Sequence, residues 1–522
     1  MIKISDIKVP EGADDEHIRK KAAHILGVRP DEIYDLKVIR RSKDARKRKN
    51  VLDVYTVSVR ADNEERLVGR AAGRSVSICE EKSYSYPCHG ERHALHRPVV
   101  IGFGPAGIFA ALLLAHEGYR PLVYERGKGI EERVIDVERF FQTGCLEPDS
   151  NVQFGEGGAG TFSDGKLSTG VKDRDGRKQY ILDTFVRHGA DRSILTDSHP
   201  HIGTDRLKSI IPSIRREIEA MGGEIRFGAK LTGIEADTGI TGIYINGDEY
   251  IPAESVFLCL GHSARDTFEM LYDTGISMES KAFAVGVRAE HKRRMIDEVM
   301  RQESASYKLT YHCRDGRGVY SFCMCPGGYV VNASSETSCL TVNGMSYASR
   351  NGENSNAAIV CTITPEDYAG FGSDALAGVR FQKSLERKAY EECGGMIPYQ
   401  KYGDFKAGRI SGDFDEVQPA CRGMYSKGNI RNVLPGYICD DIIEAMPSFG
   451  KRISGYDRDD TLFAGIEART SSPLRIVRGE DRQSLGIRGL YPVGEGAGYA
   501  GGIMSAAIDG MKSAEAYIGV YA

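Results

Sequence analysis

The sequence contains no run of eighteen apolar residues, and it does not open with a charged segment followed by an apolar one. A membrane-spanning helix needs about 20 consecutive apolar residues, so the sequence predicts no membrane partner. A secretory leader would show the charged-then-apolar pattern, and its absence predicts a cytoplasmic location.

No two of the 12 cysteines form a CxxC pair. Such a pair is typical of a thioredoxin-like redox site or a zinc ribbon, and neither is predicted. Thiols stay reduced in the cytoplasm, so we expect most of these cysteines to be small, buried hydrophobic residues. No cysteine–histidine cluster completes a metal site, and no metal is predicted.

Neither sign of charge is in large excess, since the formal net charge is only −4. Residues 1–95 carry 20 Lys/Arg against 16 Asp/Glu and include the basic run Arg40–Lys49. Such a run binds nucleic acid or an acidic electron-donor protein, or is simply solvated. Nucleic acid is the less favoured partner, because the basic charge sits in one expected hairpin with few aromatic residues.

The length of 522 residues predicts about three domains. We expect an α/β fold with a small N-terminal α+β domain at 1–95. A discontinuous Rossmann-type domain would follow at 96–278 and 476–522. The inserted residues 279–475 mix short strands and glycine turns with one clear helix, Val379–Cys393, and are predicted to form a mixed α+β substrate domain.

The N-terminal domain shows alternating and helical patterns in turn. Alternation predicts a strand at Ile2–Val9, and a helix follows from Asp14 to about Leu26. Further strands are predicted at Ile33–Arg40 and Val51–Val59.

The strongest motif is a glycine turn between an apolar strand, Val99–Ile101, and an apolar helix that runs to His116. In a GxGxxG turn the first glycine makes the tight bend, the second lets a pyrophosphate approach, and the third allows close helix–strand packing. The helix N-terminus favours phosphate, and Glu125 ends the next strand, Leu122–Tyr124, where its carboxylate can bind ribose. The predicted dinucleotide-binding residues of the turn are Gly102, Gly104, Pro105, Ala106 and Gly107.

The C-terminal segment LYPVGEGAGYAGGIMSAAIDGMKSAEAYIG has a strand, a glycine turn and a helix starting near Gly502. It resembles the late segment of glutathione-reductase-type flavoproteins, which returns to FAD. The resemblance implies that an acidic residue binds the ribitol and that the helix N-terminus faces the flavin. The departure from that pattern is Glu495, where aspartate is more usual. The residues that the resemblance assigns to the cofactor here are Gly494, Glu495, Gly501, Gly502, Ile503 and Ser505.

Two intermediate segments resemble the same fold, and longer stretches such as QFGEGGAGTFSDGKLSTG and YSFCMCPGGYVVNASSE are more specific. The longer stretches are similar to poorly characterised FAD-dependent proteins known as NAD(FAD)-utilising dehydrogenases. The resemblance adds cofactor contacts at Lys230 and Leu231 near adenine and at Gly261 beside the dinucleotide. Arg126 and Arg133 complete the predicted contacts on the Glu125 side.

A second glycine-rich stretch, Gly155–Gly165, has no strand–turn–helix frame, so we expect it to wrap the isoalloxazine or to form a flexible surface loop. Its predicted cofactor contacts are Gly158, Gly160, Thr161 and Ser163, with Asp164 as a further donor or acceptor candidate. Lys166 is predicted as a catalytic residue that stabilises negative charge on reduced flavin.

Five further side chains are candidates for the chemistry. His262 follows the glycine element and is predicted to move a proton, although a structural hydrogen bond fits equally well. Arg265 is expected near the cofactor, and Arg288 either anchors an anionic substrate or forms an ion pair. The CxC pair Cys323 and Cys325 either supplies a reactive thiol or, as we expect, packs in a buried turn.

Together these patterns predict an FAD-dependent oxidoreductase that binds FAD non-covalently and moves a hydride between flavin and a small organic substrate. The alternatives are an FAD-dependent RNA-modifying enzyme that docks RNA through the basic N-terminal domain, and a flavin-binding protein without turnover. Only one complete nucleotide-binding βαβ is visible. The electrons would then come from the substrate, from NAD(P)H bound transiently, or from a protein donor.

Overall fold

The computed structural model describes residues 1–44, 51–71, 73, 75–80 and 83–522. It has the mixed α/β character that the sequence predicts, and it divides into two compact units. Residues 170–201, which the sequence analysis placed in the nucleotide-binding domain, group with the N-terminal residues. The three-domain boundaries stay a prediction. Unit 1 comprises 1–86, 170–201 and 300–302, and unit 2 comprises 87–169, 202–299 and 303–522.

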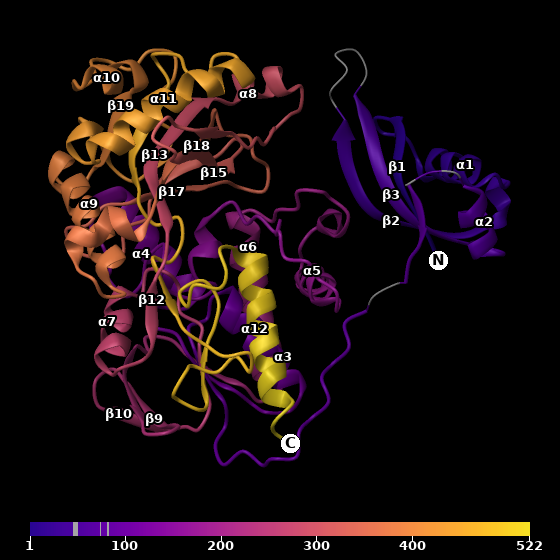
Figure 1. The fold of residues 1–522 in the computed structure, drawn as a ribbon, viewed down its shortest axis with the longest axis horizontal. Helices are drawn as coiled ribbons and strands as arrows, with labels where there is room; N and C mark the ends of the chain where they lie inside the picture. Colours follow the sequence, from indigo (N-terminus) through magenta and orange to yellow (C-terminus); the bar gives the residue numbers. More distant parts are fainter. Residues whose placement is uncertain (45–50, 72, 74, 81–82) are drawn as a thin grey trace. The chain divides into compact units, whose positions relative to one another are not determined.

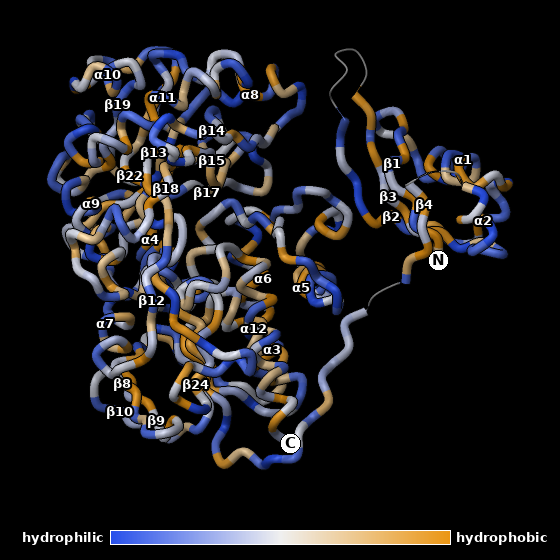
Figure 2. The backbone as a smooth tube through the Cα atoms, viewed as in Figure 1, coloured by the Kyte–Doolittle hydropathy of each residue, from blue (hydrophilic) through white to orange (hydrophobic). Residues whose placement is uncertain are grey.

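Unit 1 is built on an antiparallel sheet of order β2-β3-β1-β4. The three predicted strands are confirmed as β1 (Ile2–Pro10), β2 (Ile33–Asp44) and β3 (Leu52–Ala61), and β4 is Val76–Ile78. In β1, hydrophobic and hydrophilic residues alternate (Figure 2), and the apolar positions are buried. This period of two places one face of the sheet on the core.

The predicted first helix is confirmed as α1 (Asp15–Leu26). The side chain of Asp14 accepts a hydrogen bond from the backbone N–H of His17, and Gly27 ends the helix in a left-handed conformation. In the basic run, Arg41 pairs with the buried Asp53 at 3.0 Å, while Arg46–Lys49 lie outside the described residues. The other helices of this unit are α2 (Glu64–Arg70) and α5 (Arg177–Arg187).

Unit 2 contains a five-stranded parallel sheet of order β24-β11-β5-β6-β7. The predicted strands β5 (Val99–Ile101) and β6 (Leu122–Tyr124) pair at its centre. Because all five strands run in one direction, their carboxyl ends meet at one edge of the sheet. The outer strands are β7 (Glu224–Arg226), β11 (Val256–Leu258) and β24 (Leu490–Pro492).

Two helices that are far apart in sequence lie side by side against this sheet (Figure 1). They are α3 (Pro105–His116), in which ten of twelve residues are buried, and α12 (Ile503–Ile518). The two backbones approach closely at Gly510, where an added Cβ would lie 2.2 Å from the carbonyl oxygen of Ala106. This approach brings both glycine turns to the same edge of the sheet. Helix α6 (Thr204–Ala220) also packs on α3.

The region predicted as the substrate domain forms a seven-stranded sheet of order β14-β15-β18-β13-β22-β19-β21. The predicted helix is present as α9 (Ala377–Cys393). The expectation of one clear helix is wrong, because α11 (Gly436–Arg452) is equally long. Pro447 and the glycines of α11 lower its intrinsic helix propensity, whereas its buried apolar face stabilises it in the fold. The strands are Phe283–Lys292 (β13), Thr310–His312 (β14), Gly318–Cys325 (β15), Asn354–Ile363 (β18), Ile397–Lys401 (β19), Tyr425–Lys427 (β21) and Leu462–Glu467 (β22).

Smaller elements complete unit 2. Within the described residues, none of the helices combines the length and the apolar character needed to cross a membrane. The remaining helices are α4 (Ile130–Thr143), α7 (Arg265–Asp273), α8 (Arg293–Met300) and α10 (Tyr402–Ala407). The remaining strands are β8 (Leu231–Ala236), β9 (Ile240–Ile245), β10 (Glu249–Pro252), β12 (Met278–Ser280), β16 (Tyr329–Asn332), β17 (Val342–Met345), β20 (Cys421–Arg422) and β23 (Leu474–Ile476).

The contact between α3 and α12 predicts the effect of a substitution at Gly510. In Gly510→Val the new side chain collides with the α3 backbone, and such overpacking costs about 1–3 kcal/mol of stability. We expect a lower thermal unfolding midpoint, measured by circular dichroism. The matched control is Gly519→Val at the end of α12, where the nearest atom, the Glu515 carbonyl oxygen, is 3.4 Å away. Equal midpoints for the two variants would contradict the prediction.

Candidate functional site

A cavity that is partly open to solvent lies at the carboxyl ends of β5, β6 and β11. This is the edge at which open parallel sheets bind their ligands. Sixteen of the residues predicted from the sequence line it, although they come from separate parts of the chain. They are Gly102, Gly104, Pro105, Ala106, Glu125, Arg126, Gly158, Gly160, Ser163, Leu231, Gly261, His262, Glu495, Gly501, Gly502 and Ile503.

The three glycines of the first turn have different surroundings. A Cβ on Gly102 would lie 2.6 Å from the Cys259 carbonyl oxygen, and a Cβ on Gly107 would lie 1.9 Å from the Gly102 carbonyl oxygen. Gly104 has room, since its Cβ would meet only the Cα of Gly158 at 3.7 Å. Gly102 and Gly107 are therefore required by the protein's own packing, whereas the space at Gly104 belongs to the cavity.

Helix α3 presents its N-terminus to this cavity. Gly104 is the N-cap residue and provides no side-chain cap, and Pro105 occupies the first helical position. The free N–H groups of the first turn therefore have no side-chain acceptor at the cap. Together with the helix dipole, they form a site for a phosphate group beside the open space at Gly104.

Glu125 is buried at the end of β6, and its carboxylate accepts three backbone hydrogen bonds. The donors are the N–H groups of Phe103 at 2.8 Å, Gly127 at 2.9 Å and Gly155 at 2.9 Å. The carboxylate thus joins the first glycine turn to the second. Its contact with a ribose stays a prediction, and the structure adds this bracing role.

Arg133 does not line the cavity but lies fully buried beneath the loop 151–158. Burial lowers the pKa of its guanidinium to about 10. Thr161 is also behind the wall, where its hydroxyl donates to the Glu156 carbonyl. These two predicted cofactor residues shape the loop, and a direct contact with the cofactor stays a prediction. The Arg133 guanidinium donates to the carbonyl oxygens of Asn151, Val152, Gly155, Glu156 and Gly158.

Arg126 follows Glu125 on the cavity wall, and Arg126 and Lys230 both pair with Asp266, at 2.9 and 2.5 Å. Burial raises the pKa of the Asp266 carboxyl, but the two cations outweigh burial and bring that pKa below its usual value. The guanidinium of Arg126 also covers the ring of Phe154, 4.4 Å from its centre. Lys230 itself is not on the cavity wall, and its contact in this group is the ion pair with Asp266. The other predicted residues off the wall are Gly107, Lys166, Gly494 and Ser505.

His262 and Glu495 both line the cavity and face each other, with 3.4 Å between Nδ1 and Oε1. The Nε2 atom of His262 is buried and has no hydrogen-bond partner among the described residues. A buried polar atom of this kind needs a partner that a bound molecule can supply. His262 lies on the cavity wall next to Gly261, and its predicted part in proton transfer stays a prediction.

The N-terminus of α12 also borders the cavity. Gly501 and Gly502 leave open space where a Cβ would stand, and Gly502 caps the helix without a side chain. Gly494 is held from behind, because its N–H donates to Asp509 of the same helix at 2.9 Å. The open glycines, the two uncapped helix N-termini and the unpartnered His262 fit an elongated dinucleotide such as FAD.

The C-terminal region contributes wall residues that sequence reasoning missed: Phe322, Asn343, Arg469 and Thr470. Arg469 is fixed by buried partners, since it donates to Ser263 at 2.9 Å and to both carboxylate oxygens of Glu386. No local sequence motif identifies these residues, because they meet the predicted cofactor-binding residues only in the folded protein. Further missed wall residues are Gln153, Ala229, Ser263, Ala264 and Thr267.

Arg265 and Arg288 are structural rather than exposed to the cavity. Arg265 forms a bidentate pair with Glu386 at 2.6 and 2.9 Å, and Arg288 pairs with Glu467 at 2.7 Å. The substrate-anchor hypothesis for Arg288 is therefore wrong, and the ion-pair alternative is confirmed. Burial raises the pKa of Glu467 to about 7.

The CxC pair has one residue on the cavity wall. Cys323 is half-buried and lines the cavity, whereas Cys325 is fully buried. The ammonium of Lys166 lies 3.8 Å from each sulfur and 3.5 Å from the carboxylate of Asp164. Lys166 therefore stands behind the cavity wall, and the expectation that the whole pair is buried is wrong for Cys323.

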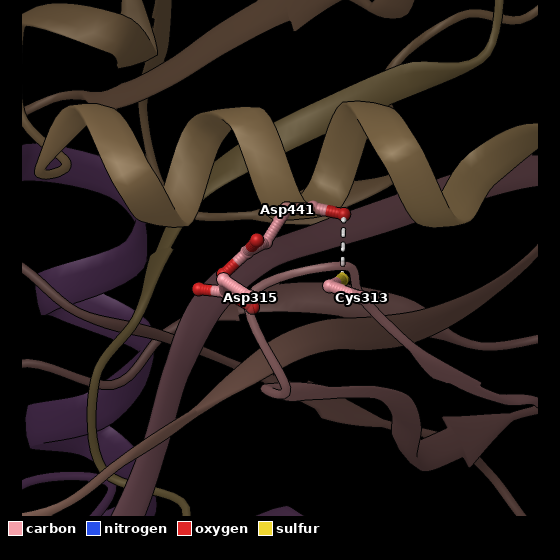
Figure 3. Close-up of side chains that lie close together, drawn as sticks. All are labelled: Cys313, Asp315 and Asp441. Carbon is pink, nitrogen blue, oxygen red and sulfur yellow. Dashed lines mark hydrogen bonds between the residues drawn. The ribbon is translucent and has the colours of Figure 1, made fainter.

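A separate group of potential metal ligands lies between β14, its following turn and α11 (Figure 3). One ligand atom each of Cys313, Asp315 and Asp441 lies within 4.8 Å of the others. The thiol of Cys313 donates to the backbone carbonyl of Asp441, and burial raises the pKa of this thiol to about 12. Asp315 is paired with Arg317 at 3.0 Å. These contacts keep the Cys313 thiol protonated and engage the Asp315 carboxylate with Arg317.

The buried hydrogen bonds of Arg133 predict that Arg133→Gln destabilises the protein. The variant leaves several buried carbonyl groups without donors, at about 1–3 kcal/mol each before relaxation. We expect a clearly lower midpoint of thermal unfolding. We also expect faster hydrogen exchange of the backbone amides in the loop 151–158. Arg139→Gln on the same helix, where the side chain is half exposed, serves as the control. Unchanged exchange in the loop would refute the bracing role.

Comparisons with known proteins support FAD as the cofactor. Residues 282–470 match a family model described as FAD-dependent protein, C-terminal domain-like, and residues 1–60 match a Domain of unknown function (DUF8436). An uncharacterised protein of Clostridium beijerinckii is 43% identical over 526 residues, which cover 98% of each chain.

Solved structures give much weaker likenesses. Glycerol-3-phosphate dehydrogenase from Bacillus halodurans, complexed with FAD, is 11% identical with a TM-score of 0.35 over 83% of this chain and 66% of that chain. Glycine oxidase from Bacillus cereus is 10% identical with a TM-score of 0.34 over 82% and 98%. Since both scores are below 0.5, no argument rests on them. The full-length relative shows the family: the chain belongs to the family of the Clostridium beijerinckii protein, and its residues 282–470 match the model of an FAD-dependent protein's C-terminal domain.

Proposed function

We propose that the protein binds one FAD non-covalently and is an oxidoreductase for a small organic substrate. One observation carries this proposal. A single cavity joins the first glycine turn, the late turn at Gly501 and Gly502, and wall residues of the FAD-dependent C-terminal domain such as Arg469 and Thr470. A cofactor and a substrate can therefore meet in one space.

The groups on the cavity wall orient the cofactor. The phosphate site at Gly104 and the Glu125 carboxylate both belong to this wall, so the pyrophosphate and the adenosine ribose belong beside them. Leu231 and Ala229 provide apolar contact for the adenine. The isoalloxazine then reaches the α12 N-terminus, whose positive dipole favours the negative charge of a reduced flavin.

Bound FAD would supply hydride transfer at flavin N5, and the protein's part is to bind, orient and move protons. The free Nε2 of His262 can hold a proton for the substrate, while Glu495 fixes the opposite ring nitrogen. Asn343 and Thr470 can donate hydrogen bonds to polar groups of the substrate, and Phe322 covers its apolar part. Arg469 is held on the same wall by Glu386 and Ser335, so its charge is already paired and its part is to position that wall.

The source of electrons belongs to the same proposal. Unit 2 has one parallel sheet with one glycine turn of the dinucleotide type among its described residues, so it provides one dinucleotide site. We infer that NAD(P)H, if it is the reductant, binds transiently at the open part of the cavity. A protein donor is the alternative. Anaerobic titration with NADH and NADPH, followed by absorbance, distinguishes these two sources.

The purified protein should be yellow, with about one FAD per chain that acid or heat releases. Gly104→Val should abolish FAD binding while the protein stays folded, because its side chain would occupy cavity space and clash with little else. Absorbance and circular dichroism measure the two effects. Gly436→Val is the matched control, since a Cβ there meets nothing within 4 Å and lies off the cavity wall. Stoichiometric FAD in the Gly104 variant would show that the phosphate site is misplaced.

His262→Gln should retain FAD but slow substrate turnover by about 100-fold or more, the usual contribution of general acid–base catalysis. The rate of flavin reduction by the identified donor, followed by stopped flow, gives the measurement. His312→Gln is the control, because His312 is exposed and off the cavity wall. Wild-type rates in the His262 variant would leave this residue a purely structural role.

A further inference from the structure

Strand β15 contains a bulge at the CxC pair. Phe322 pairs with Ala358 and Cys325 with Asn356, so β15 has one residue more than β18 over this stretch. Cys323 occupies the bulge with a φ of +43°, a left-handed conformation that is strained for a residue with a side chain. Neighbouring residues of a regular strand face opposite sides, yet Phe322 and Cys323 both line the cavity. The bulge therefore places Cys323 beside Phe322 on the cavity wall.

Positive charge surrounds this thiol pair. Lys166 lies 3.8 Å from both sulfurs, and a guanidinium nitrogen of Arg288 lies 3.5 Å from the Cys325 sulfur and 2.5 Å from the Cys323 carbonyl oxygen. The nearby acids are already paired, Asp164 with Arg350 at 2.5 Å and Glu467 with Arg288. Cations that close favour a thiolate over a thiol.

The two sulfurs have different states. The hydrogen bond from Cys325 holds the pKa of Cys323 well below its usual value, and Lys166 and Arg288 lower it further against the effects of burial and Asp164. The same hydrogen bond and burial raise the pKa of Cys325 well above its usual value. Cys323 is thus the thiol on the cavity wall whose ionisation these groups favour, and Cys325 is the buried thiol beside it, which donates to the Cys323 carbonyl oxygen at 3.3 Å.

We propose that Cys323 is a nucleophilic residue that forms a covalent bond to conjugated carbonyl compounds in this cavity, with Lys166 and Cys325 as positioning residues. The chemistry of the site indicates this class of ligand. A thiolate is a soft nucleophile and adds readily to an activated carbon, while the phenyl ring of Phe322 and the amide of Asn343 can hold a flat, polar acceptor. The proposal extends the proposed function, because Cys323 lines the cavity assigned to FAD.

The addition step balances without an oxidant or a reductant. The Cys323 sulfur forms a bond to the β-carbon of the acceptor as the carbon–carbon π bond breaks. The electron pair moves toward the carbonyl group, and a proton from solvent completes the adduct at the α-carbon. Lys166 stays protonated and keeps the sulfur ionised until the bond forms.

N-ethylmaleimide, a conjugated acceptor, tests the proposal on the full-length protein. Labelling is followed against pH, and each cysteine peptide is quantified by mass spectrometry. We expect Cys323 to react faster than the exposed Cys88 and Cys145 at neutral pH, with a midpoint well below pH 9. Lys166→Met should raise this midpoint and slow labelling at neutral pH by about tenfold or more, since one pKa unit changes the thiolate fraction tenfold.

Two controls make the outcome decisive. Lys427→Met removes a lysine paired with Asp413 on the surface and should leave the Cys323 profile unchanged. Cys325→Ala should raise the midpoint, because the supporting hydrogen bond is lost. Slow labelling of Cys323, or a midpoint that Lys166→Met does not move, would overturn the proposal.

Flavin content separates this proposal from the function proposed above. Protein without FAD that still labels rapidly at Cys323 would refute the cofactor assignment and leave the nucleophile in place. Stoichiometric FAD with an unreactive Cys323 would have the opposite meaning. Bound FAD is expected to slow the labelling of Cys323 in the holoprotein relative to the apoprotein, because the cavity assigned to FAD is the one that Cys323 lines.

Discussion

Two buried charges hold the cavity open, and the rest of the site depends on them. The carboxylate of Glu125 accepts N–H groups from both glycine turns, while the guanidinium of Arg133 donates to carbonyls of the loop 151–158. A glycine-rich loop has few side chains of its own to pack, so its conformation has to be fixed through its backbone. The pair of charges satisfies donors on one side and acceptors on the other. The space at Gly104 exists because both sets of bonds are made.

This arrangement explains why the parallel sheet and the C-terminal region have to be considered as one site. The sheet supplies the phosphate end through α3, and α12 returns from the end of the chain to supply the opposite end. The intervening residues 282–470, which match the FAD-dependent domain, provide the wall at which a substrate would bind. Arg469 is immobilised by Glu386 and Ser263, so this wall is prepared before any ligand arrives.

The local parts of the fold and site could be predicted from the sequence, because their signals are contiguous. The strand–turn–helix at Val99–His116 and the late turn at Gly501 follow from short patterns of glycine and apolar residues. The bracing role of Arg133 could not be predicted, since its acceptors are backbone carbonyls that carry no residue signal. Helix α11 was missed because Pro447 lowers its propensity, and the turn of Cys323 toward the cavity depends on a bulge that only strand pairing reveals.

The central claim is that one cavity orients FAD with its pyrophosphate at Gly104 and its isoalloxazine at the α12 N-terminus. The most direct test is a crystal structure of the protein with FAD. We predict the pyrophosphate on the free N–H groups of α3, the flavin ring beside Gly501, Gly502 and His262, and the Cys323 sulfur facing the space next to the ring. FAD bound in the reverse direction, or outside this cavity, would contradict the account.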